Sequence, residues 1–282
     1  MISIAFLALL LILYAALLVP LTRHLQEKPF LEKVGYVPQP SIIKTLACDQ
    51  RHAVAAGLVF KVLIYFGTLV EKKKNTAASP PDDTAMRAIL MATSRLDPYN
   101  MDTYYFAQSL VWDETKVRET VELLEYGMRY RDWDFYLPFF AGFDAAYFLK
   151  DYNTAAKHYA TAARLTGSDL FSKLASRYMH EAGQTELAIG YLDAMIKGSR
   201  NEAIKASFEM RRSALLEVRR IEVARDQFRD KFKRFPASLE ELYDRGFLIS
   251  PVKDPYGGHF YLEADGSVRT TSKFASKSDK AQ

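Results

Sequence analysis

The feature that most constrains this chain is a pattern of small and large residues that recurs at intervals of 33 to 35 residues. In the segment YFLKDYNTAAKHYATAARL, Ala155, Tyr159 and Ala162 fall on one face of a helix as small, large, small. Related triplets stand 33 residues later and 35 residues earlier, at Ala188, Leu192 and Met195 and at Thr120, Leu124 and Gly127. A helical hairpin cannot cover its own apolar face, so repeated hairpins stack and bury that face between them. The spacing predicts such an array over about 84–200, with an ordinary helical bundle as the alternative.

Three units can be read, near 101–135, 136–168 and 169–201, and a partial unit precedes them with Ala53 to Val70 as its first helix. The period and the small–large–small face resemble the tetratricopeptide repeat (TPR), a helix–turn–helix of about 34 residues. The first helices depart from the Trp-Leu-Gly-Tyr pattern of that family, reading Tyr104, Ala107, Gln108 and Val111, then Phe139, Gly142, Phe143 and Ala146. The resemblance implies a TPR-like α-α solenoid over 48–201.

In that family the first helix of each unit lines a concave groove that holds a peptide or a helix of a protein partner. Carried onto this sequence, the groove positions are Tyr105, Ser109, Trp112, Phe140, Asp144, Tyr147, Lys173, Arg177 and His180. Aromatic residues at one end and cations at the other would suit a partner with an acidic end. The alternatives stay open: Phe140 and Tyr147 as core residues, and Lys173 and Arg177 as a solvated face.

The N-terminus carries an uncharged apolar segment, Ile2 to Leu21, which would cover roughly 30 Å as a helix, the thickness of a bilayer core. Its start lacks Lys and Arg, so we expect an uncleaved transmembrane anchor over 1–22 rather than a signal peptide. A connector follows over 23–47. The apolar stretch Ala53 to Val70 has a lysine at its centre, so a packed helix is favoured over a second membrane span.

The sequence after the repeats differs from them in its predicted structure. A long charged helix is expected over 202–235, and a module over 236–273 combines a short helix, capped by Ser238 and Glu241, with a β-hairpin around Asp265-Gly266. A disordered tail is expected over 274–282. The run of long helix, RFPASLEEL, DPYGG and hairpin over about 215–272 resembles the C-terminal half of type II secretion major pseudopilins. The N-terminal segment lacks the cleavable Gly and the glutamate of that family, so a borrowed or convergent module is inferred.

The predicted fold class is therefore mainly α, with an N-terminal transmembrane helix, a TPR-like solenoid and a small C-terminal helix-and-hairpin module. The whole resembles membrane-anchored TPR proteins of bacteria, which implies a scaffold in an assembly of the cell envelope, at the inner membrane. Basic residues Arg23, Lys28 and Lys33 after the anchor favour a cytoplasmic soluble part. The pseudopilin-like tail favours the periplasm instead.

No motif in the sequence indicates a catalytic site. The net charge of +4 is mild and spread along the chain, which disfavours nucleic acid as a partner. Cys48 is the only cysteine and no two histidines are spaced as a metal pair on a helix, so neither a metal nor another cofactor is expected. We expect a non-enzymatic adaptor that binds protein partners. The rivals are a structural component of a pilus- or secretion-type machine and an enzyme whose site forms only in three dimensions.

Overall fold

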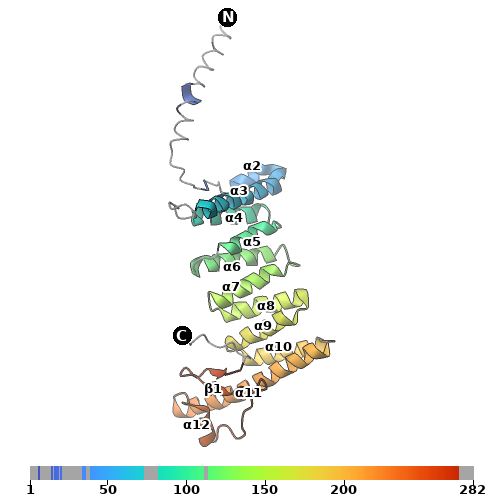
Figure 1. The fold of residues 1–282 in the computed structure, drawn as a ribbon, viewed down its shortest axis with the longest axis vertical. Helices are drawn as coiled ribbons and strands as arrows, with labels where there is room; N and C mark the ends of the chain where they lie inside the picture. Colours follow the sequence, from blue (N-terminus) through green and yellow to red (C-terminus); the bar gives the residue numbers. More distant parts are fainter. Residues whose placement is uncertain are drawn as a thin grey trace. The chain divides into compact units, whose positions relative to one another are not determined.

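The computed structural model of the chain describes residues 34–35, 39–72, 82–110 and 114–272, together with positions 6, 14, 16–18 and 20. Side chains of 68–72 and of residue 114 are outside this description, as are the predicted tail and nearly all of the predicted anchor. The described chain is mainly helical, with one two-stranded antiparallel sheet near its C-terminal end (Figure 1), so both expectations are confirmed. It divides into two compact units at Phe106 and Ala107, inside helix α5 (Met101–Ser109).

Within 39–72 and 82–100, the structure describes three helices of the first unit and a short 3₁₀ turn, Cys48–Gln50. The helices are α2 (Pro40–Ala47), α3 (Arg51–Lys72) and α4 (Asp83–Leu96). Helix α2 lies within the stretch expected to be only a connector, and its first residue is a proline, which needs no hydrogen bond there. Helix α3 packs on α4, as the sequence favours for Ala53 to Val70. No helix in the described ranges is both long and apolar enough to cross a membrane.

Asp82 is the N-cap of α4, and its Oδ1 accepts a hydrogen bond from the backbone N–H of Ala85 at 3.1 Å. The backbone N–H of Asp82 itself donates to the hydroxyl of Tyr65 on α3 at 2.9 Å. This contact fixes where the chain turns from loop to helix, and it could not be read from the neighbouring acidic residues alone.

The second unit is a succession of helices, each packed on the next along the chain (Figure 1). The helices are α6 (Glu114–Met128), α7 (Tyr136–Tyr147), α8 (Tyr152–Thr166), α9 (Asp169–Glu181), α10 (Thr185–Gly198) and α11 (Glu202–Phe232). Helices α5, α7 and α9 begin at Met101, Tyr136 and Asp169, which are 35 and 33 residues apart. Asp151 caps α8 through its side chain, and Gly167 ends that helix in the left-handed conformation.

The recurring small and large residues form the interior of this unit. Ala155 and Ala162 are fully buried, and the ring of Tyr159 between them stacks on Tyr178 of α9 with 5.5 Å between centroids. Gly142 on α7 faces the same ring, and a Cβ added there would lie 3.1 Å from it. Small residues on α7 and α8 therefore let the helices approach closely around one aromatic layer, as the sequence pattern predicts.

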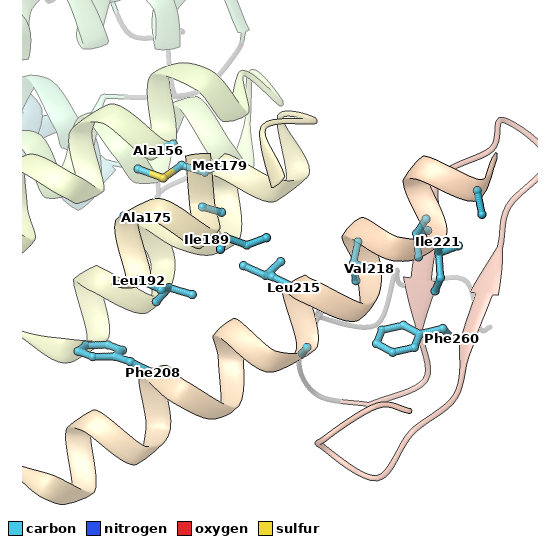
Figure 2. Packing of buried hydrophobic residues seen from close by; sticks show 14 of the residues in the cluster. Ala156, Ala175, Met179, Ile189, Leu192, Phe208, Leu215, Val218, Ile221 and Phe260 are labelled. Atoms are coloured by element: carbon cyan, nitrogen blue, oxygen red, sulfur yellow. The ribbon is translucent and has the colours of Figure 1, made fainter. Parts of the chain in front are cut away.

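The C-terminal module shares its core with the helices. It consists of α12 (Leu239–Asp244) and strands β1 (Phe260–Leu262) and β2 (Val268–Thr270), which pair antiparallel with Tyr261 opposite Arg269. Figure 2 shows Phe260 near Val218 and Ile221 of α11, in the hydrophobic cluster that also holds Leu192 and Met179. The module is therefore continuous with the helical stack.

The expected capping box of α12 forms only in part. Ser238 is the N-cap residue, but its side chain does not bond to the helix backbone. Glu241 accepts a hydrogen bond from the N–H of Ala237 at 2.9 Å and forms an ion pair with Arg234. The hydrogen bond from Arg234 holds the pKa of Glu241 well below its usual range. Glu241 thus accepts from the N–H of Ala237, whereas a complete capping box would use the N–H of the N-cap residue, Ser238.

Candidate protein-docking surface

Helix α7 carries a row of aromatic side chains on its solvent-facing side. Tyr136, Phe140, Phe143 and Tyr147 follow one another at spacings of four, three and four residues, so they lie on one face of the helix. Three of them are well exposed, Tyr136 at 44%, Phe143 at 40% and Tyr147 at 62%, and Phe140 is half-buried. We call these four residues the α7 aromatic stripe. The opposite side of α7 is also apolar and is buried in the stack.

The rings of the stripe support one another. Phe143 and Tyr147 stack at 5.5 Å with an interplanar angle of 7°, and Tyr136 and Phe140 stack at 6.1 Å. Phe148 meets the Tyr147 ring edge-on, and the Lys150 ammonium lies 5.4 Å from the centre of that ring. Side chains that are already ordered lose little conformational entropy when a partner binds. The stripe is therefore a preorganised apolar surface.

Helix α9 lies beside α7, because Phe171 contacts Phe139 with 5.7 Å between ring centroids. Two cationic residues of α9 were predicted to belong to the groove. Lys173 forms an ion pair with Asp169 at 2.8 Å, and the Arg177 guanidinium lies 5.4 Å from the ring of Tyr178. Both are half-buried. The aromatic row of α7 and these cations thus belong to neighbouring helices of one unit.

The structure separates the nine predicted groove residues into groups. Phe140 and Tyr147 lie in the stripe, and Lys173 and Arg177 lie on the adjacent helix. Tyr105 is half-buried in the part of α5 that belongs to the first unit, and Ser109 is exposed at the end of α5. Trp112 lies outside the described residues. The remaining two, Asp144 and His180, have interior partners.

Asp144 is fully buried next to the stripe. The side-chain amide of Gln108 donates to its Oδ1 at 2.8 Å, and its Oδ2 has no hydrogen-bond partner in the described part of the chain. Burial raises the pKa of this carboxyl to about 6, and the hydrogen bond from Gln108 offsets part of that rise. Asp144 is therefore a group of the interior, one step around the helix from the exposed aromatic face.

His180 faces α10 and α11. Its Nδ1 lies 3.0 Å from the hydroxyl of Thr185, which donates at 2.9 Å to the carboxyl of Glu222. Because the hydroxyl proton of Thr185 points to Glu222, Nδ1 of His180 must be the donor in the first bond. Burial lowers the pKa of His180 to about 4 and raises that of Glu222. This chain of bonds joins three helices and leaves His180 neutral.

Sequence reasoning missed part of the stripe. Tyr136 and Phe143, together with the adjacent Phe148, were not among the predicted groove positions, because those were carried over from the repeat family. A signal was present in YLPFFAGFDAAY, where aromatics recur on one helix face independently of any family pattern. Exposure could not be read from that pattern, since a buried helix would show the same spacing.

A hollow of about 770 Å³ lies where α8 and α10 end and α9 and α11 begin. Its walls are mostly apolar and include Tyr191, Met195, Ile204 and Phe208. Among the described residues that line it there is no histidine, cysteine or glutamate, and its aspartate, Asp169, is paired with Lys173. Nowhere in the described ranges do three potential metal-ligating residues of the His, Cys, Asp and Glu types gather.

Comparisons of the chain with protein-family models, with curated proteins and with solved structures gave no match.

Proposed function

We propose that the protein is a non-enzymatic, membrane-anchored scaffold of the TPR type that binds protein partners in an assembly of the bacterial envelope. The observation that carries this proposal is the α7 aromatic stripe. Aromatic residues are enriched in the buried centres of protein interfaces, and a contiguous exposed apolar patch marks an interaction site. A stacked helical array with an exposed aromatic face on one helix offers a surface on which a peptide or a helix of a partner can dock.

The chemistry of the surface suggests the kind of partner. Tyr136, Phe143 and Tyr147 offer flat apolar area for the apolar side of a peptide or a helix. Lys150 borders Tyr147, and Lys173 and Arg177 lie on the neighbouring helix. Acidic side chains on the same partner would be attracted by these cations, which favours one orientation over the reverse. The proposal involves no nucleic acid and no cofactor.

Residues 2–21 would hold the scaffold in the inner membrane. Their sequence supports an anchor on grounds of length and lack of charge. The basic residues after the anchor favour the cytoplasmic side for the remainder of the chain, whereas the pseudopilin-like module favours the periplasmic side. The proposed docking surface consists of the same residues whichever side of the membrane the soluble part occupies.

The proposal is tested by removing the aromatic surface without disturbing the core. A Phe143→Ser/Tyr147→Ser variant of the full chain is compared with Leu187→Ser/Tyr261→Ser, which removes two other exposed apolar side chains. Tagged proteins are purified from detergent-solubilised membranes, and bound proteins are quantified by mass spectrometry. We expect a defined set of proteins to be lost from the first variant alone. Identical sets from both variants and the wild type would refute the stripe as the docking surface.

A structural component of a pilus- or secretion-type machine is the second candidate. It is favoured by Ile249, which is 95% exposed beside Leu216 and Val223 of α11 at a shallow hollow of about 450 Å³. Deleting residues 234–282 would not test this cleanly, because Leu242 and Phe260 belong to the core. An Ile249→Glu substitution changes only the surface. Loss of assembly with unchanged partners at the stripe would favour the structural role.

A further inference from the structure

Helix α3 has apolar residues on both of its sides. Its inner side, including Ala55, Val59 and Val62, is buried in the first unit. A second set of residues recurs at spacings of three and four and is exposed. This outer face of α3 consists of Ala53, Ala56, Gly57, Phe60, Leu63, Ile64 and Gly67. Phe60 is 62% exposed and Ile64 is 52% exposed. The outer face therefore extends over four turns of helix without a polar side chain.

Such a face is unusual on a helix that water surrounds. A helix with an apolar solvent-facing side as well as an apolar packed side normally meets a further apolar surface there, either protein or membrane. In a stack of hairpins, the outer side of a terminal unit has to be polar, because no further unit covers it. Leu46 of α2 adds a further exposed apolar side chain nearby in the chain. The outer face is therefore a candidate surface for contact with an apolar environment.

The charges near the outer face indicate which apolar environment fits. Between residues 39 and 67 the acidic side chain is Asp49, whereas Lys44, Arg51 and Lys61 are cationic and exposed. The sequence continues with one further acidic residue, Glu71, and then with three lysines at 72–74. Lysines and arginines beside an apolar helical face are the pattern of helices that lie in the plane of a membrane, with the cations at anionic headgroups.

The chain also keeps this helix near a bilayer, if residues 2–21 anchor it. Only 18 residues separate Leu21 from Pro40, the first residue of α2. Fully extended, they reach at most about 65 Å. We propose that the outer face of α3 lies in the interfacial region of the same bilayer, parallel to its plane. This inference rests on the proposed membrane anchoring, and it gives the first unit a fixed orientation on the membrane surface.

The test uses the full chain in vesicles of phosphatidylcholine and phosphatidylglycerol. Cys48 is exposed and is first replaced by Cys48→Ser, so that single new cysteines can carry a fluorescent label. The label is placed by Phe60→Cys or Ile64→Cys on the outer face, and by Leu187→Cys on α10 as a control of similar exposure. Quenching is measured with a nitroxide attached to lipid chains and with iodide in the water.

We expect the lipid quencher to remove most of the emission at positions 60 and 64 and little at 187, and iodide to show the reverse order. Labels at 60 and 64 that iodide reaches as easily as the label at 187 would overturn the inference. So would labels shielded from both quenchers, because a protein partner or a second copy would then cover the face. Flotation of the vesicles separates the two proposals. If the protein floats with the vesicles but the lipid nitroxide does not quench its labels, the membrane anchor is supported and the placement of α3 is refuted. If the protein does not float, both proposals are contradicted.

Discussion

Arg269 on strand β2 forms an ion pair with Glu181 at the end of α9, with 2.6 Å between Nη1 and Oε2, although 88 residues separate them. The side chain of Glu181 is only 10% exposed. The bond attaches the C-terminal hairpin to the helix that carries Lys173 and Arg177. The module is thus held against the array by charge as well as by the apolar core around Phe260.

An Arg269→Ala variant should therefore lose stability. The substitution leaves the largely buried Glu181 carboxylate without its partner, and we expect the free energy of unfolding to fall by about 1–3 kcal/mol. Lys205→Ala is the matched control, because its partner Glu202 is highly exposed and such pairs contribute about 0–1 kcal/mol. Urea denaturation of both variants measures the difference. Equal effects would show that the pair between Arg269 and Glu181 does not fix the hairpin.

The close approach of the helices predicts the effect of a larger residue at Ala162. This residue is fully buried in the stack beside α9. Ala162→Leu should overpack the core and cost about 1–3 kcal/mol. The neighbouring Ala160 is half-buried and lines the 770 Å³ hollow, so Ala160→Leu has room and should cost much less. Thermal unfolding distinguishes the variants, and an equal loss from both would contradict the assigned packing.

Features set by neighbours in the sequence could be predicted. The burial of Ala155, Tyr159 and Ala162 follows from their helical spacing, because a stacked hairpin must hide that face. The hairpin follows from Asp265-Gly266, where glycine takes a φ of +83° and the Asp265 side chain accepts from the N–H of Ser267. These features need only a few adjacent residues, so their sequence signals are strong.

Features set by distant residues could not be predicted. Asp144 was expected on the groove, but its side chain is paired with Gln108, which lies 36 residues away and has no sequence signature as a partner. His180 was expected on the same surface, and its partner Thr185 is fixed only by the packing of α9 on α10. A single helical step decides between the exposed and the buried side of these helices. Which residues are buried depends on how neighbouring helical units pack against each other, and no local sequence pattern specifies that packing.

The burial of Asp144 predicts a dependence of stability on pH. Burial raises the pKa of Asp144 from the usual 3.8 to about 6 in the folded protein, so the folded protein holds this proton more tightly than the unfolded chain does. Its contribution to the free energy of unfolding is complete below the pKa that Asp144 has in the unfolded chain. The contribution is lost as the pH rises through the pKa that Asp144 has in the folded protein. Acidification from about pH 7 to about pH 5 should therefore add about 1 kcal/mol from this group.

An Asp144→Asn variant should lack this contribution. Asparagine keeps an oxygen that can accept the bond from Gln108 and cannot ionise. Urea unfolding of variant and wild type at both pH values gives the contribution of the Asp144 carboxyl as the difference in unfolding free energy between the two proteins. A difference that does not change with pH would mean that the Asp144 carboxyl titrates in the folded protein as it does in water.

The most direct test of the docking surface is site-specific photo-crosslinking in intact cells. A benzophenone amino acid replaces Tyr147 in the α7 aromatic stripe or, as a control, Leu187 on α10, which is similarly exposed at 54%. The proposal predicts discrete adducts with a protein partner from position 147 that are absent from position 187. It also predicts their loss when Phe143→Ser is added. The same adducts from both positions, or none from position 147, would contradict a docking role for the stripe.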